Sequence, residues 1–136
     1  MITGLAHVCF TVNDLDRSTA FYRDVVGMEP AFDFRRPSGE LFGRYLRMGR
    51  RTFLELFQGQ GVAAGGEKTT YRHLCLEVDD IRATADELRR RGADVGEVKL
   101  GSDGSWQAWL TDPDGNRIEL HQYTPESRQT PFLTEN

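Results

Sequence analysis

Two histidines and two glutamates recur at matching positions in the two halves of this chain. His7 opens an alternating apolar run, and His73 opens a similar run 66 positions later (73 − 7). Glu55 lies in the middle of another apolar run, and Glu119 takes the same place in its counterpart, 64 positions later (119 − 55). A duplicated unit with a pseudo-twofold axis would bring the four side chains together. Two neutral imidazoles and two carboxylates suit a divalent transition metal, so the spacing predicts a metal site.

The residue pattern of the first half predicts the elements that would position His7 and Glu55. Alternation in residues 5–12 is typical of a strand that packs one face on a helix. Asn13 and Asp14 can cap a helix, and Gly27 stands where the C-terminal cap of that helix belongs. Further strands are expected at 30–34, 43–48 and 52–58, which gives the order β-α-β-β-β.

The second half repeats this order. A strand at 72–78 precedes a helix that is capped by the pair Asp79-Asp80 and ends at Gly92. Strands are then expected at 95–99, 106–111 and 117–123, the last two joined by a turn rich in Asp, Pro and Gly. Each repeat is too short to be stable unless it packs on something.

We therefore predict the α+β class, with paired βαβββ modules that form a cup-shaped mixed sheet in a single domain over residues 1–136. The expected parts are a first module at about 4–59, a linker at 60–70, a second module at about 71–123 and a C-terminal tail at 124–136. Modules with open sheet edges need a partner surface, so a homodimer is expected.

Alternation also predicts where the four candidate ligands point. Each shares its strand face with aromatic or moderately polar residues, whereas its neighbours form an apolar face for the helices. Taken one at a time, each would be interpreted as a solvent-facing carboxylate or a satisfied strand histidine. Their recurrence in both repeats favours a shared site instead. Glu55 also lies between Phe53 and Phe57, where an unpaired charge would be costly.

Composition limits the possible partners. The chain has 136 residues, 38% of them hydrophobic and 28% charged, which indicates a soluble globular protein. A net charge of −4 argues against a nucleic-acid partner, and the only basic cluster, residues 89–91, lies at an expected helix end. No apolar stretch is long enough to cross a bilayer, so we expect no membrane partner, a cytoplasmic location and reduced Cys9 and Cys75.

The sequence resembles the vicinal oxygen chelate superfamily, which includes glyoxalase I, extradiol dioxygenases, methylmalonyl-CoA epimerase and fosfomycin and bleomycin resistance proteins. The resemblance rests on the β-α-β-β-β repeat, the opening segment 7–18 with Phe21, Tyr22 and Gly27, and the closing segment 112–120. It covers residues 4–123, nearly the whole chain.

Within the superfamily, the ligand set is most similar to that of glyoxalase I. This resemblance implies that His7, Glu55, His73 and Glu119 bind Ni²⁺, Co²⁺ or Zn²⁺, with Glu119 as general base and Glu55 as ligand or second base. It also implies a lyase or isomerase that converts a thiol hemithioacetal, or a related small molecule, through an enediolate. Dioxygenases and fosfomycin transferases generally lack a carboxylate at the position of Glu55.

Alternatives remain open at other positions. Thr11 stands where glyoxalase I proteins carry an arginine that holds glutathione, so the thiol is not specified, and Arg35 and Arg36 are either another anion contact or solvated. His121 either lines the pocket or bonds to backbone. The rival functions are a non-catalytic protein that sequesters a drug or natural product, and another enzyme of the superfamily such as an epimerase or dioxygenase. Pocket-wall roles are expected for Cys9 and Cys75, and either wall or core positions for Trp106 and Trp109.

Overall fold

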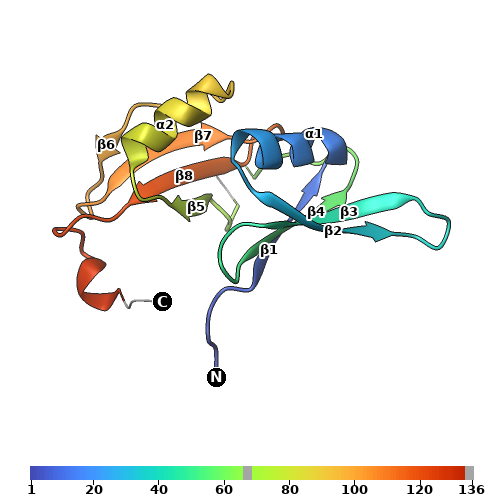
Figure 1. The fold of residues 1–136 in the computed structure, drawn as a ribbon, viewed down its shortest axis with the longest axis horizontal. Helices are drawn as coiled ribbons and strands as arrows, with labels where there is room; N and C mark the ends of the chain where they lie inside the picture. Colours follow the sequence, from blue (N-terminus) through green and yellow to red (C-terminus); the bar gives the residue numbers. More distant parts are fainter. Residues whose placement is uncertain (66–68, 134–136) are drawn as a thin grey trace. The chain divides into compact units, whose positions relative to one another are not determined.

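The computed structural model describes residues 1–65 and 69–133 of the chain. Its contacts divide these residues into two compact units. The first unit comprises Met1–Ala64 together with the turn Asp112–Gly115. The second unit comprises Gly65–Thr111 and the segment that begins at Asn116. Each unit is a four-stranded mixed sheet with one long helical segment, as Figure 1 shows.

The first unit has the strand order β1-β4-β3-β2. β1 pairs with β4 in parallel, and the other two pairs are antiparallel. Leu54, Leu56 and Leu46 are fully buried on the face that receives the helix, as the alternation predicts. The elements are β1 (His7–Val12), α1 (Leu15–Ala20), η1 (Phe21–Val25), β2 (Glu29–Arg35), β3 (Leu41–Arg47) and β4 (Phe53–Gln58).

The helix of the first unit begins as predicted but changes its winding. The Asp14 side chain accepts a hydrogen bond from the Arg17 amide and caps α1. From Phe21 the chain continues as a π-helix, η1, which the residue spacing does not predict. Gly27 then has a φ of 91°, the left-handed conformation in which a glycine ends a helix without strain.

The second unit has the equivalent order β5-β8-β7-β6, with β5 and β8 parallel. Asp80 caps α2, whose Ile81, Ala85 and Leu88 are buried, and Figure 1 shows the helix along one face of this sheet. The α+β class with two βαβββ units is therefore confirmed. The elements are β5 (Leu74–Glu77), α2 (Ile81–Arg90), β6 (Lys99–Leu100), β7 (Trp106–Thr111), β8 (Arg117–Gln122) and the 3₁₀ helix η2 (Thr130–Phe132).

The strand expected at 95–99 is wrong in its extent. Only Lys99 and Leu100 form a strand, β6. The Arg89 guanidinium donates hydrogen bonds to the carbonyl oxygens of Val95 and Gly96, so these carbonyls bond to a side chain instead of a neighbouring strand. β5 is also shorter than expected.

Two other expectations concern the linker and the membrane. In the expected linker, residues 60–65 and 69–70 form neither helix nor strand, and residues 66–68 lie outside the described part of the chain. Across the described residues, no helix is both long and apolar enough to span a bilayer.

Candidate metal centre

The first histidine–glutamate pair lies on the open face of the first sheet. Parallel pairing places Cys9 opposite Glu55, so His7, two residues before Cys9, shares that face. The His7 Nε2 atom is 3.7 Å from Glu55 Oε2. The histidine side chain is 45% exposed and the glutamate 16%, so both can reach a small molecule that enters from this face.

Cys9 and Tyr45 surround Glu55 on neighbouring strands. Partial burial, together with a hydrogen bond to Glu55, raises the pKa of the Cys9 thiol to about 11. The thiol is therefore protonated at neutral pH and serves Glu55 as a hydrogen-bond donor. Tyr45 pairs with Glu55 across β3 and β4, and its ring meets the His7 ring edge-on at 5.7 Å.

Aromatic rings extend from this pair across β2, β3 and β4. Phe32 stacks on Tyr45 at 4.8 Å, and Phe42 stacks on Phe57 at 5.9 Å. Gly43 makes room for them, because a Cβ atom at this position would lie 2.5 Å from Cδ1 of Phe57. The first unit therefore presents an aromatic wall beside its carboxylate. The wall consists of Phe32, Phe34, Phe42, Tyr45, Phe53 and Phe57.

The second pair lies at the equivalent register of the second sheet. Cys75 is opposite Glu119 across β5 and β8, as Cys9 is opposite Glu55. His73, one residue before β5, places Nε2 3.0 Å from Glu119 Oε2. The Trp109 ring meets the His73 ring edge-on at 4.9 Å, which makes this tryptophan part of the wall of the site.

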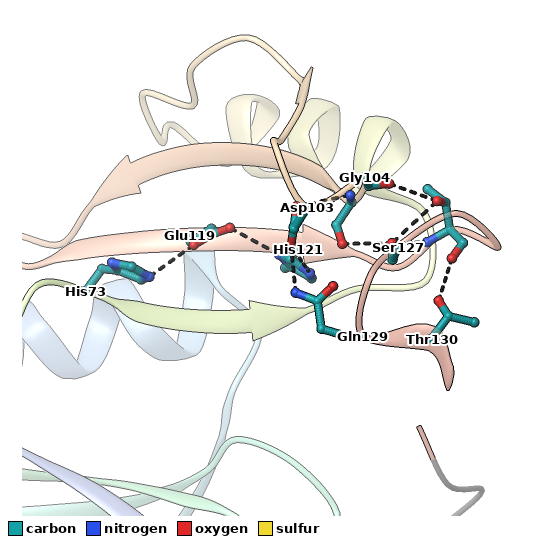
Figure 2. Close-up of polar contacts among 10 residues, drawn as sticks. His73, Asp103, Gly104, Glu119, His121, Ser127, Gln129 and Thr130 are labelled. Carbon is teal, nitrogen blue, oxygen red and sulfur yellow. Dashed lines mark hydrogen bonds and ion pairs between the residues drawn. The ribbon is translucent and has the colours of Figure 1, made fainter. Parts of the chain in front are cut away.

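Glu119 makes a further contact through its other carboxylate oxygen. The Oε1 atom is 3.1 Å from Nδ1 of His121, as Figure 2 shows. Glu119 and His121 are both buried, with 6% and 7% of their surface exposed. The alternation of β8 predicts that the two side chains share a face, but it does not predict their burial. His121 thus lines the site, which decides between the two interpretations of this residue.

The second unit also brings three metal-binding residue types together. Donor atoms of Cys75, Glu119 and His121 all lie within 4.8 Å of one another. Burial is the main cause that raises the pKa of the Cys75 thiol to about 11, and the charge of Glu119 adds to it. Imidazole and carboxylate groups are donors that fit a divalent metal here.

Two residues near this site have no signal in the sequence pattern. Asp103 lies in the loop before β7, and its Oδ2 atom is 3.9 Å from Nε2 of His121. Gln129 of the C-terminal tail donates a hydrogen bond of 2.7 Å to the same Asp103 oxygen. Figure 2 shows Asp103 above His121 and Gln129 below it. A loop and a tail without periodicity gave no basis for predicting either contact.

The arginine pair of the first unit is engaged locally. Arg35 Nη2 is 3.0 Å from Asp33 Oδ2, and Arg36 Nε is 3.1 Å from Glu40 Oε2. Both guanidinium groups are already neutralised within the β2–β3 hairpin, which argues against an anion site at this loop.

The fold and these pairs are those of a duplicated βαβββ protein with an imidazole–carboxylate pair in each repeat. The chain belongs to the Glyoxalase/Bleomycin resistance protein/Dioxygenase superfamily, whose family model matches residues 4–120. This confirms the family expected from the opening and closing segments.

Curated relatives within this superfamily carry different activities in their names. The chain is 36% identical over 123 residues to a lactoylglutathione lyase of Haemophilus influenzae, covering 85% of this chain and 90% of that protein. It is 34% identical to a probable lactoylglutathione lyase of Synechocystis sp., covering 87% of this chain and 94% of the relative. A metallothiol transferase of Staphylococcus epidermidis is 27% identical over 99% of this chain and 92% of its own length.

Similar solved structures also differ in the activities that they are named for. A lactoylglutathione lyase from Agrobacterium tumefaciens aligns with a TM-score of 0.62 at 27% identity, covering 89% of this chain and 94% of the other. An antibiotic-binding protein from Streptomyces sp. CB03234 aligns with a TM-score of 0.69 at 28% identity, covering 90% of this chain and 98% of the other. The family therefore includes both enzymes and a binding protein at similar distances.

Proposed function

We propose that this protein is a metal-dependent, glyoxalase I-like lyase or isomerase that acts on a thiol hemithioacetal or a related small molecule. The observation that carries the proposal is the repeated pair: His7 with Glu55 in one unit and His73 with Glu119 in the other, at the same strand register. The names of the relatives at 33–36% identity support the same reaction class.

The four residues would hold a divalent metal, Ni²⁺, Co²⁺ or Zn²⁺. Their donor atoms fit this group, because neutral imidazole nitrogens and carboxylate oxygens bind such ions. When bound, the metal supplies Lewis-acid stabilisation of the negative charge that develops on two neighbouring substrate oxygens. The proposal holds whether the four residues come from one chain or from two copies of it.

The two glutamates would move the proton. Isomerisation of a hemithioacetal requires removal of a proton from one carbon and its return to the adjacent carbon. A carboxylate that faces both carbons can do both steps, and we assign this role to Glu119, with Glu55 as a ligand or second base. Trp109 and the aromatic wall would exclude water from the charged intermediate.

The thiol of the substrate is a separate question. Thr11 and the run Phe57-Gln58-Gly59 lack the arginine and asparagine that hold glutathione in glyoxalase I proteins, and Arg35 and Arg36 are paired within their own hairpin. We therefore propose that the substrate is the hemithioacetal of a thiol whose binding needs no arginine at position 11. We also propose a homodimer, because the edge strands of each sheet need a partner surface, and a cytoplasmic location.

The first test is metal stoichiometry followed by turnover. Protein freed of metal with a chelator is loaded with Ni²⁺, Co²⁺ or Zn²⁺ and assayed with hemithioacetals of methylglyoxal and several thiols. We expect about one ion per His7–Glu55–His73–Glu119 set, and turnover that Glu119→Gln abolishes while the fold is retained. Glu97→Gln is the control, because this exposed carboxylate in the second unit forms an ion pair with Lys99.

Other outcomes would identify a different function. Full activity of Glu119→Gln would exclude this residue as the base. Metal binding with no isomerase activity, but with thiol transfer to a small molecule, would favour the activity for which the metallothiol transferase relative is named. Absence of metal binding, with tight binding of an aromatic natural product, would favour a sequestering protein, the alternative that the aromatic wall would serve.

A further inference from the structure

The two units differ at the position two residues after the glutamate. Two-residue spacing on a strand keeps side chains on one face, so this residue lies beside the carboxylate in both units. In the first unit it is Phe57, whose ring cannot donate a hydrogen bond to Glu55. In the second unit it is His121, whose Nδ1 atom is 3.1 Å from Glu119 Oε1. The two units therefore differ beside their glutamates: only the second unit has an imidazole at this position.

The two carboxylate oxygens of Glu119 have different partners, because His121 contacts only one of them. An N–H group at Nδ1 donates to Oε1, which leaves Oε2 directed at His73, 3.0 Å away. A buried carboxylate with a donor on one oxygen keeps a single orientation. Glu55 is less constrained, since its side chain is more exposed than that of Glu119 and His7 lies 3.7 Å away.

The other side of the His121 ring faces a second carboxylate. Nε2 is buried and, within the described residues, makes no hydrogen bond, but Asp103 Oδ2 lies 3.9 Å from it. Asp103 is itself held at both oxygens. Gln129 donates to Oδ2 at 2.7 Å, and the Ser105 amide donates to Oδ1 at 3.1 Å. The negative charge of Asp103 therefore has a fixed place beside the ring.

The C-terminal tail locks the loop that carries Asp103. The hydroxyls of Ser105 and Ser127, both buried, are 2.8 Å apart, and Thr124 Oγ1 donates to the Gly104 carbonyl at 2.8 Å. Figure 2 shows these contacts to the right of His121. Gly104 has a φ of 82°, and a Cβ atom there would lie 2.7 Å from the Glu126 carbonyl oxygen. Only glycine allows so close an approach of the tail.

We propose that His121, which lies beside the Asp103 loop that the tail holds, is a positioning residue that fixes Glu119 as the anchored carboxylate of the metal site. The inference rests on the proposed function. Residues that hold a metal ligand by hydrogen bonds commonly contribute 10–100-fold, roughly, to metal affinity or activity.

The test uses two substitutions at one position. His121→Phe copies Phe57 of the first unit and removes the donor, whereas His121→Asn keeps an amide donor near the position of Nδ1. Glu97→Gln, at an exposed carboxylate of the second unit that pairs with Lys99, is the control. Co²⁺ and Zn²⁺ affinities are measured by competition with a chromogenic chelator, and the absorption spectrum of the Co²⁺ protein reports the ligand geometry.

We expect His121→Phe to weaken metal binding by about 10–100-fold and to change the Co²⁺ spectrum. His121→Asn should recover most of the affinity, and the control should bind as the wild type does. Where activity is measured, kcat should fall more than KM rises. Gln129→Leu, which leaves His121 in place, should give a smaller loss in the same direction and serves if His121→Phe fails to fold.

Two results overturn the proposal in different ways. If the wild-type protein binds metal and folded His121→Phe binds it within twofold, the positioning role is wrong while the proposed function stands. If the wild-type protein binds no metal, the proposed function fails and the positioning role fails with it. Equal losses in His121→Asn and His121→Phe would show a packing role only, and this also contradicts the proposal.

Discussion

The Tyr22 hydroxyl donates a hydrogen bond of 2.8 Å to Oδ2 of Asp112, 90 residues further along the chain. Both residues are buried, and both belong to the first unit. The other oxygen of Asp112 accepts from the amide of Asp114 at 2.9 Å, which fixes the turn Asp112–Gly115. Asn13 binds the same turn through both oxygens of Asp114. One short turn from the distant part of the chain thus completes the first unit.

Removal of the Tyr22 hydroxyl should therefore destabilise the protein. Tyr22→Phe keeps the ring but leaves a buried carboxylate oxygen with one donor fewer, which costs about 1–3 kcal/mol. Urea unfolding followed by circular dichroism measures the free energy of unfolding. Tyr71→Phe, at an exposed tyrosine, is the control. A loss no larger than that of the control would mean that the bond to Asp112 contributes nothing net.

The close approach at Gly43 predicts a packing defect. Gly43→Ala would place a Cβ atom 2.5 Å from Phe57 Cδ1 and 3.0 Å from the Leu56 carbonyl oxygen. The Phe57 ring must move, and overpacking of this kind costs about 1–3 kcal/mol. Thermal unfolding checks this, with Gly49→Ala as control because its nearest atoms are 3.8 Å away. The double variant Gly43→Ala/Phe57→Leu should recover part of the lost stability. If it recovers none, contact with the Phe57 ring is not the cause of the loss.

Bound metal should stabilise the folded chain. A ligand that binds only the native state, at about 100 times its Kd, adds about 2.7 kcal/mol at 25 °C. We therefore expect Zn²⁺ or Ni²⁺ to raise the thermal midpoint and a chelator to reverse the shift. Glu55→Gln should reduce the shift, because it removes one anionic donor. An equal shift in Glu55→Gln and in the wild type would argue that Glu55 does not bind the ion.

The parts of the fold that the sequence predicts correctly are those in which local pattern and tertiary packing agree. Alternation in β4 and β8 sets the buried leucines on one face and Glu55 and Glu119 on the other, because the period of a strand is two. Asp14 and Asp80 start the helices because their side chains cap the first turn. The roles of the four predicted ligands remain predictions, although each pair is formed within its unit.

The predictions from sequence are wrong or incomplete where contacts with side chains outside the local pattern determine the structure. The residue pattern predicts that residues 95–98 belong to a strand. In the structure they do not, and the Arg89 side chain donates hydrogen bonds to the carbonyl oxygens of Val95 and Gly96. Asp103, which lies near His121, and Gln129, which donates to Asp103, come from a loop and a tail without periodicity. Such contacts do not affect the spacing of apolar residues along the sequence. The positions of Asp103 and Gln129 near the site therefore could not be predicted.

The Asp103 carboxyl gives a prediction about pH. The hydrogen bond from Gln129 is the main cause that holds the pKa of Asp103 below its usual value near 3.8, and the nearby His121 adds a smaller effect. A depressed pKa in the folded state means that Asp103 stabilises the fold above its unfolded pKa. This contribution is lost as the pH falls through the lower, folded pKa.

Gln129→Leu removes the main cause and should raise the pKa of Asp103 toward its usual value. The carboxyl resonance of Asp103, followed by carbon-detected NMR from pH 7 down to acid, measures the change. The Gln129→Leu protein should also lose less stability on acidification than the wild type does, because less of its stability depends on an ionised Asp103. Gln60→Leu, at an exposed glutamine of the first unit, is the control. An unchanged pKa of Asp103 in Gln129→Leu would mean that the tail does not hold this carboxylate in solution.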